Sequence, residues 1–257
     1  MRLKTAITVL VIVLSCSVPA NVFLSWQAMK YYLDSQMVRL DPASEHKFAE
    51  EDRRLQKPGP GQTRIVLIGD SRIAQWNPLP SPANCQIVNR GVSAETTAQT
   101  ILRLKRDVID LEPRIIVVQV GINDLKNIGV FPKQKDEIVG SCWKNLNTII
   151  SQTREHNIQV VMLTVFPTGP VGLLRRIIWS SEIRNGTDRV NEMMRNLKCE
   201  GVTVVDCDSI LSANKAIKAP RYAQGTFHLT AAGYQALNAT LTPLLEKLAP
   251  DHSKHNE

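Results

Sequence analysis

Two residues of this chain have the types and surroundings that nucleophilic catalysis requires. Ser71 follows the apolar run Arg64–Ile68 and a Gly69-Asp70 pair, so it lies where a strand ends and a helix begins. A hydroxyl at such a position projects into the crevice at the sheet edge, near main-chain amides and the positive end of a helix dipole. Serine is a weak nucleophile and needs a base to accept its proton.

His228 is the strongest candidate for that base among the five histidines. It lies in a loop before an expected helix that can pack beside the first strand. The other four lie in a charged segment, just before the amino end of a strand, or in the polar tail: His46, His156, His252 and His255. We therefore predict that Ser71 and His228 form a nucleophile–base pair for acyl transfer.

Acyl transfer also needs hydrogen-bond donors for the oxyanion that develops on the substrate. Gly91 can bring its amide close to a ligand because it has no side chain. Asn123 offers a carboxamide donor, and Gly121 permits the tight turn that would aim it. Each of these residues also has a purely structural interpretation: Ser71 as a helix N-cap, and Gly91 and Asn123 as turn residues.

The elements that must position these side chains alternate along the sequence. Short apolar runs predict buried strands at 64–68, 86–89, 115–120, 158–165 and 202–205. Helical spacing predicts helices at 95–111, 136–156, 181–198 and 230–248, the last with Thr230 as its N-cap. Such alternation implies a parallel sheet covered on both faces, with the functional residues at the carboxyl ends of the strands.

The N-terminus predicts export from the cytoplasm. Two basic residues precede an apolar stretch that begins at Ala6, as in a signal peptide. The stretch is also long enough to span a bilayer if it is retained, and a loose lipobox ends at Cys16. In each case the remainder lies outside the cytoplasm, so we expect an extracytoplasmic protein that is membrane-anchored, or secreted or periplasmic.

Four regions follow from these patterns. Residues 1–26 are the expected signal peptide or membrane anchor, and 27–61 a helical stalk or linker. The Pro-Gly-Pro-Gly sequence that ends at Gly61 stops any helix and marks the boundary. Residues 62–250 form the expected catalytic domain, and 251–257 a polar tail.

Composition argues against several other functions. The chain has 257 residues, a net charge of +7 and 43% hydrophobic residues, which is typical of a globular protein. Its basic residues are scattered, which predicts a solvated basic surface and no nucleic-acid partner. The five cysteines form no CxxC pair, so no zinc site is expected, and free thiols and disulfides are both open. We expect no metal and no cofactor, and the oligomeric state is left open.

Four blocks of sequence resemble those of the SGNH hydrolases, the GDSL-type esterases and lipases. They are Gly69-Asp70-Ser71, Gly91 within Asn-Arg-Gly-Val-Ser, Gly121-Ile-Asn123-Asp124 and His228-Leu-Thr, in the family's order. The resemblance covers roughly residues 64–248 and implies a three-layer α/β/α sandwich with about five parallel strands, the flavodoxin-like SGNH hydrolase fold. It also implies Ser71 as nucleophile, His228 as base, and an oxyanion hole formed by the amides of Ser71 and Gly91 and the side chain of Asn123.

One position departs from the family pattern. The family usually places an Asp three residues before the catalytic histidine, and here that position is Gly225. The third group fixes the imidazole tautomer and stabilises the imidazolium. Three possibilities follow: a main-chain carbonyl orients His228, Asp206 or Asp208 reaches it, or activity is weakened towards a binding role.

The segment 167–179 should border the active site because it follows the carboxyl end of a strand. It combines six apolar residues with Arg175 and Arg176, which fits either a lid or acyl-chain wall that touches the membrane, or a short packed helix with exposed basic residues. Arg72, beside the nucleophile, could contact an anionic leaving group, lie on the surface or pair with a carboxylate.

The expected function is an extracytoplasmic serine hydrolase that cleaves acyl or acetyl esters of a lipid or a carbohydrate. An apolar lid would favour lipid substrates, and an open polar cleft would favour acetylated sugars. The alternatives are an O-acyltransferase that acts on envelope sugars and a catalytically weakened envelope binding module. The expected partners are a small ester substrate and, through the N-terminal segment, the membrane.

Overall fold

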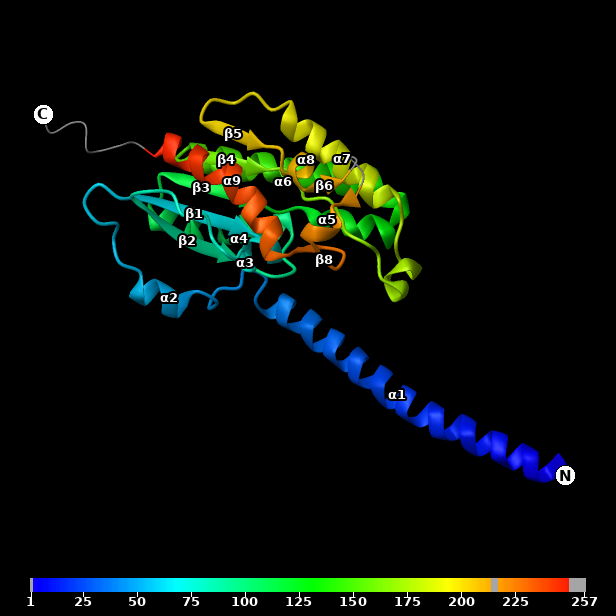
Figure 1. Ribbon diagram of the computed structural model, residues 1–257. Helices are drawn as coiled ribbons and strands as arrows, with labels where there is room; N and C mark the ends of the chain where they lie inside the picture. The colour runs from blue at the N-terminus through cyan, green and yellow to red at the C-terminus, as the bar shows by residue number, and fades with distance from the viewer. Residues whose placement is uncertain (1, 214–216, 250–257) are drawn as a thin grey trace, which may run out of the picture. The chain divides into compact units, whose positions relative to one another are not determined.

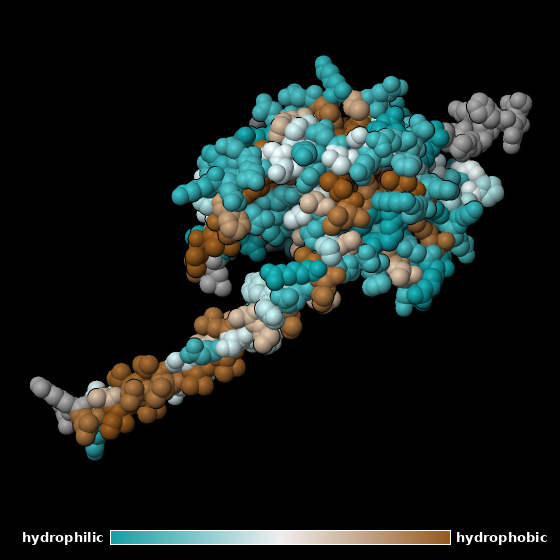
Figure 2. Space-filling model, turned by 180° about the vertical axis from the view of Figure 1, so that it is seen from behind, coloured by the Kyte–Doolittle hydropathy of each residue, from teal (hydrophilic) through white to brown (hydrophobic). Residues whose placement is uncertain are grey.

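The computed structural model describes residues 2–213 and 217–249 and divides into two compact units, Met1–Glu45 and His46–Glu257. The first unit contains α1 (Arg2–Leu40), one continuous helix with Pro19 inside it. Its segment Leu3–Leu40 is long and apolar enough to cross a membrane, a property that N-terminal signal sequences share. Figure 2 shows hydrophobic residues along most of this helix. The predicted polar tail 251–257 lies outside the described residues.

A five-stranded parallel sheet forms the centre of the second unit, in the order β2-β1-β3-β4-β5 (Figure 1). This confirms the parallel sheet predicted from the apolar runs. The strands are β1 (Thr63–Gly69), β2 (Cys85–Gly91), β3 (Ile115–Gln119), β4 (Gln159–Leu163) and β5 (Val202–Val205).

Helices cover both faces of the sheet, which confirms the three-layer sandwich. Alternate side chains of each strand enter different cores: Val66 and Ile68 enter one, whereas Ile65 and Leu67 enter the other. Each of these fully buried side chains contributes roughly 1.5–3 kcal/mol of hydrophobic stabilisation. One core is closed by α4 (Thr97–Asp107), α6 (Lys135–Arg154) and α7 (Glu182–Arg195), and the other by α3 (Ser71–Ala74), α8 (Cys207–Leu211) and α9 (Ala231–Leu248).

Short elements connect these layers and shape the sheet's carboxyl edge. Thr230 caps α9 by accepting a hydrogen bond from the Gly233 amide, as predicted. All five cysteines are free thiols. The short elements are α2 (Ala49–Arg54), α5 (Ile122–Leu125), η1 (Ile109–Leu111), η2 (Lys126–Gly129), η3 (Pro132–Gln134), η4 (Leu173–Ile177), η5 (Pro220–Tyr222), and the strand pairs β6 (Ser212–Ala213) with β7 (Ile217–Lys218) and β8 (Ala223–Gln224) with β9 (His228–Leu229).

The segment expected to be a stalk is divided between the two units. Its first part continues α1 as far as Leu40, while α2 belongs to the second unit, which begins at His46. Phe48 is buried, and the Arg90 guanidinium lies 4.5 Å from the centre of its ring. Arg90 is itself buried in β2 and pairs with Glu51 and Asp52 of α2. These contacts hold α2 against the edge strand of the sheet.

Candidate active site

Ser71 is the first residue of α3 and follows β1 after a tight turn. Gly69 has φ +152°, and a Cβ atom there would lie 1.8 Å from the carbonyl oxygen of Gln119. Only glycine therefore allows β1 to pass this close to β3 at the turn. Asp70 caps α3, because its Oδ1 accepts a hydrogen bond from the Arg72 amide at 2.9 Å. The turn fixes the direction in which the Ser71 side chain leaves the sheet.

His228 lies within hydrogen-bonding distance of Ser71, although 157 positions separate the two in sequence. Its Nε2 atom is 3.1 Å from the Ser71 Oγ atom. This separation suits the transfer of the serine proton to the imidazole. In Figure 1, α3 and α5 lie at the carboxyl ends of the strands together with β8, which pairs with β9, the strand that carries His228. The structure thus brings the two predicted residues together.

The main chain around His228 is held by two buried cations. Arg72 Nε donates to the Phe227 carbonyl at 3.0 Å, and Lys218 Nζ donates to the His228 carbonyl at 2.8 Å. Arg72 is fully buried and lies 5.2 Å from the centre of the Phe166 ring. The interpretations of Arg72 as a surface charge or a leaving-group contact are therefore wrong. It ties α3, which begins with Ser71, to the residue that precedes His228.

The electrostatic surroundings of His228 are cationic. Burial lowers the pKa of its imidazole, and the charges of Arg72, Lys218 and Arg175 lower it further. Burial also lowers the pKa of Lys218, to about 7. A carboxylate beside the imidazole would act in the opposite direction. His228 is consequently neutral, and able to accept a proton, at a lower pH than an ordinary histidine.

The aspartates considered as a third catalytic group lie elsewhere. Asp206 accepts hydrogen bonds from Arg195 and Ser209, and Asp208 pairs with Arg184 and Arg195. Neither carboxylate contacts the histidine, so the possibility that one of them orients it is wrong. Both are committed to arginines of α7.

Gly225 occupies the turn that joins β8 to β9, with φ +64°. No heavy atom lies within 4 Å of the position that its Cβ would take. Within residues 2–213 and 217–249, neither a carboxylate nor a carbonyl forms a hydrogen bond with His228 Nδ1. The arrangement is a Ser–His pair whose histidine is positioned through its main chain.

Asn123 lies in α5 with its carboxamide held at both ends. Its Nδ2 donates to the Glu95 carbonyl at 2.9 Å, and its Oδ1 accepts from Lys126 Nζ at 2.7 Å. The side chain is buried, with 7% exposure. Because Nδ2 carries two hydrogens, one stays available for a ligand after the bond to Glu95 is made.

Gly91 has a packing role at the end of β2. A Cβ atom there would lie 2.1 Å from the Ala74 backbone nitrogen, so glycine is needed for α3 to pack against the strand. The Gly91 amide donates to Asn89 Oδ1 at 2.9 Å. This amide, expected to bind the oxyanion, is therefore already engaged in the structure.

Ala94 is a candidate functional residue that the sequence analysis did not predict. It is exposed in the loop between β2 and α4 and has φ +65°, which is rare for a residue other than glycine. The next residue, Glu95, carries the carbonyl that holds Asn123. In the described parts of the chain, the amides of Ser71 and Ala94 have no hydrogen-bond acceptor. The only signal in the sequence is position, in a loop that follows a strand of the sheet.

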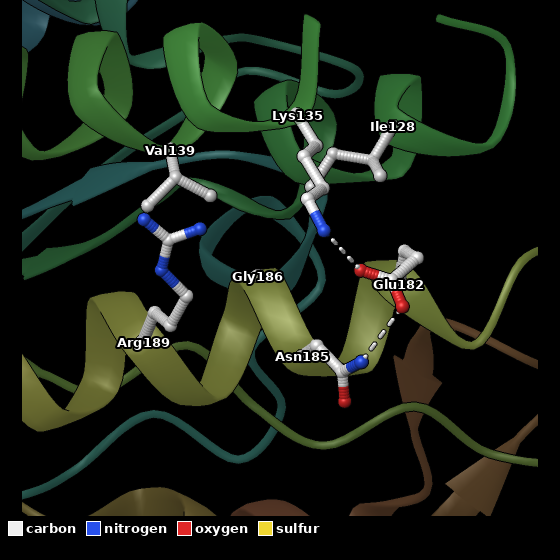
Figure 3. Close-up of a pocket in the computed structure, with 7 residues that line it drawn as sticks. All are labelled: Ile128, Lys135, Val139, Glu182, Asn185, Gly186 and Arg189. Carbon is white, nitrogen blue, oxygen red and sulfur yellow. Dashed lines mark hydrogen bonds and ion pairs between the residues drawn. The ribbon is translucent and has the colours of Figure 1, made fainter. Parts of the chain in front are cut away.

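A separate surface pocket lies between α6 and α7 and contains neither Ser71 nor His228 (Figure 3). Lys135 Nζ donates to Glu182 at 3.1 Å, and Asn185 donates to the same carboxylate at 3.0 Å. Lys135 and Glu182 of the pocket thus neutralise each other, and Arg189 pairs with Asp136 beside it. The described residues contain no group of three or more His, Cys, Asp or Glu side chains that could hold a metal ion.

Residues 67–236 match the GDSL-like lipase/acylhydrolase family. Because this match covers more than half of the chain, the protein belongs to that family. A segment of 126 residues is 26% identical to the uncharacterized lipoprotein YqeF of Bacillus subtilis (strain 168), covering 42% of this chain and 51% of that protein. The chain thus spans about half the length of this relative.

Two solved structures share the fold. A GDSL-like lipase from Bacteroides thetaiotaomicron VPI-5482 aligns with a TM-score of 0.64 and 24% identity, over 80% of this chain and 98% of that one. LAE5, an alpha/beta hydrolase from the metagenome of Lake Arreo, Spain, aligns with a TM-score of 0.50 and 19% identity, over 76% of this chain and 100% of that one.

Proposed function

We propose that this protein hydrolyses carboxylic esters through an acyl-enzyme formed on Ser71. The observation that carries the proposal is the 3.1 Å separation between Ser71 Oγ and His228 Nε2 at the carboxyl edge of the sheet. Ser71 Oγ attacks the acyl carbon while His228 takes its proton. The bond from the acyl carbon to the alcohol oxygen then breaks, and His228 returns the proton to the departing alcohol. Water attacks the acyl-enzyme by the same route and releases the acid.

The proposed oxyanion hole consists of the Ser71 amide, the Asn123 carboxamide and the Ala94 amide. Ala94 takes the role expected for Gly91, because the Gly91 amide already donates to Asn89 whereas the Ala94 amide has no acceptor in the described chain. The hydrogen bond from Asn123 to the Glu95 carbonyl joins two of these donors in one rigid unit. Fixed donors of this kind stabilise the charge that develops on the acyl oxygen.

The proposed location is outside the cytoplasm, with α1 as a membrane anchor or signal. Two features support it: the length and apolar character of α1, and the similarity to a protein that is named a lipoprotein. The proposed function includes acyl or acetyl esters of either a lipid or a carbohydrate as substrates.

The binding module is a second candidate because His228 Nδ1 lacks a partner among the described residues. In that case the fold would bind esters without turning them over. Turnover of a simple ester distinguishes the two functions, and analysis of the products in the presence of an acceptor sugar distinguishes hydrolysis from acyl transfer to the sugar.

The test compares the purified full-length protein with Ser71→Ala on 4-nitrophenyl butyrate. We expect the variant to lose at least about 10³-fold in kcat/KM, because the serine carries the covalent step. Ser151→Ala, at an exposed position of α6, is the matched control and should retain the original rate. Equal rates for the protein and Ser71→Ala would refute the assignment.

A further inference from the structure

Two accessible cations flank the Ser71–His228 pair. Lys126, half-buried at the end of α5, donates from Nζ to Asn123 Oδ1 at 2.7 Å. Arg175 is exposed in η4, and its guanidinium carbon lies 4.6 Å from the centre of the Phe227 ring. Lys126 Nζ lies 6.0 Å from the centre of the same ring. Phe227 directly precedes the histidine. Both cations therefore border the space between the proposed oxyanion donor and the base.

In the part of the chain that the structure describes, these two cations have no carboxylate partner, in contrast to others on the same domain. Lys135 pairs with Glu182 at 3.1 Å, as Figure 3 shows, and Arg189 pairs with Asp136. Among residues 2–213 and 217–249, no ion pair includes Lys126 or Arg175. Among the described residues, Lys126 and Arg175 therefore lie beside the site without a carboxylate that neutralises them.

The nearest acids are committed to the fold. Asp70 is fully buried and caps α3, and Asp124 accepts hydrogen bonds from the Thr97 amide and hydroxyl at 3.0 and 2.6 Å. Lys126 and Arg175 repel each other, and this repulsion contributes with burial to a lowered pKa of Lys126. An anion supplied from outside would relieve the repulsion. Because the site is partly desolvated, the anion would interact with the two cations more strongly there than on an open surface.

Apolar side chains surround Arg175 in the same segment. Leu173 is 77% exposed and Ile177 is 83% exposed, and Ile178, which follows, is 55% exposed. The interpretation of this segment as a packed helix with only its basic residues exposed is therefore wrong. A surface that combines exposed aliphatic residues with arginine suits an amphiphile that has both a chain and an anionic group.

We propose that the substrate is an anionic amphiphile: a lipid ester with a phosphate or carboxylate group that Arg175 and Lys126 bind, and an apolar chain that lies against η4. Arginine binds such oxyanions through two parallel hydrogen bonds, and lysine adds a point charge. The inference rests on the proposed Ser71–His228 hydrolysis, and it adds which ester the site selects.

The experiment uses full-length protein in neutral detergent micelles that contain either dioleoylphosphatidylglycerol or dioleoylphosphatidylcholine at equal mole fraction. The two lipids share their acyl chains and differ in headgroup charge, and the released oleate is measured. We expect about tenfold faster release from the anionic lipid, and Arg175→Gln should lower this ratio about fivefold. Arg176→Gln is the matched control: it removes the same charge one residue along η4, and should preserve the ratio.

The outcomes separate this inference from the proposed function. Hydrolysis of neutral 4-nitrophenyl butyrate, abolished by Ser71→Ala, reports on the proposed function alone. If that activity is present while the two phospholipids react at equal rates, the inference fails and the proposed function stands. An equal fall in the ratio for Arg175→Gln and Arg176→Gln would show only general attraction to a charged micelle and would overturn the assigned site. Hydrolysis confined to acetylated anionic polysaccharide would overturn the lipid assignment.

Discussion

Ser71 and His228, the proposed nucleophile and base, are supported in different ways. The turn that carries Ser71 is fixed by close backbone contacts: Gly69 against Gln119, and Gly91 against Ala74. The turn that carries His228 leaves space only around the Cβ position of Gly225. Hydrogen bonds to its main-chain carbonyls hold it: Gly169 donates to Thr226, and two buried cations donate to Phe227 and His228. The main chain thus positions the proposed catalytic histidine, whose side chain has no carboxylate partner among the described residues.

Replacing His228 should have the greatest effect, and it tests whether the imidazole acts as a base without a carboxylate partner. His228→Ala should lower kcat/KM for 4-nitrophenyl butyrate by about 10³-fold, since general-base assistance contributes roughly 10²–10⁴. His156→Ala, at an exposed position remote from the site, should leave the rate unchanged. A loss of less than about tenfold in His228→Ala would mean that another group accepts the proton.

Two glycine substitutions compare the two turns directly. Gly91→Ala should cost about 3 kcal/mol in the free energy of unfolding, because the new Cβ would meet the Ala74 backbone at 2.1 Å. Gly225→Ala should cost only about 1 kcal/mol, the strain of φ +64° with no steric contact. Urea unfolding followed by tryptophan fluorescence measures both. Equal costs would contradict the contrast between a packed and an open turn.

The pH dependence tests the cationic surroundings of the base. His228 must be neutral to act, and its pKa is lowered from the ordinary 6.5 by burial and by Arg72, Lys218 and Arg175. The acid limb of kcat/KM should therefore have its midpoint below pH 6.5, with activity rising as pH rises through it. Arg175→Gln should move the midpoint upward. A midpoint above 6.5 would indicate a carboxylate beside the imidazole.

The buried carboxyl of Asp70 could also produce an acid limb in the pH profile, so the experiment needs a variant that removes this ionisation. Burial raises the pKa of Asp70 to about 6, so its titration falls close to that of the histidine. Asp70→Asn keeps an acceptor for the Arg72 amide and removes the ionisation. The acid limb should persist in this variant, and its disappearance would assign the limb to Asp70.

A much smaller effect is expected at Asp206, which the sequence analysis considered as a substitute for the family's missing carboxylate. Asp206→Asn should change kcat/KM by less than about twofold, since its carboxylate bonds to Arg195 and Ser209 and is independent of the site. Steady-state kinetics on the same ester provide the measurement. A hundredfold loss would show that Asp206 reaches the histidine during turnover.

Sequence patterns predict the frame of this protein and part of its site. The five parallel strands of the central sheet follow from buried apolar runs, and Ser71 and His228 meet because both lie at the carboxyl edge, whereas the order of the strands comes from the structure. Ala94 was not predictable, because its left-handed conformation arises without a glycine to signal it. The burial of Arg72 and the docking of α2 through Arg90 depend on contacts between distant segments, which local patterns do not report.

The most direct test of the account is labelling with a serine-directed fluorophosphonate, followed by peptide mass mapping of the full-length protein. We expect a single adduct on Ser71, formed far more slowly in His228→Ala and absent in Ser71→Ala. An unlabelled protein, or an adduct on another serine, would contradict the claim that this Ser–His pair is a working nucleophile and base.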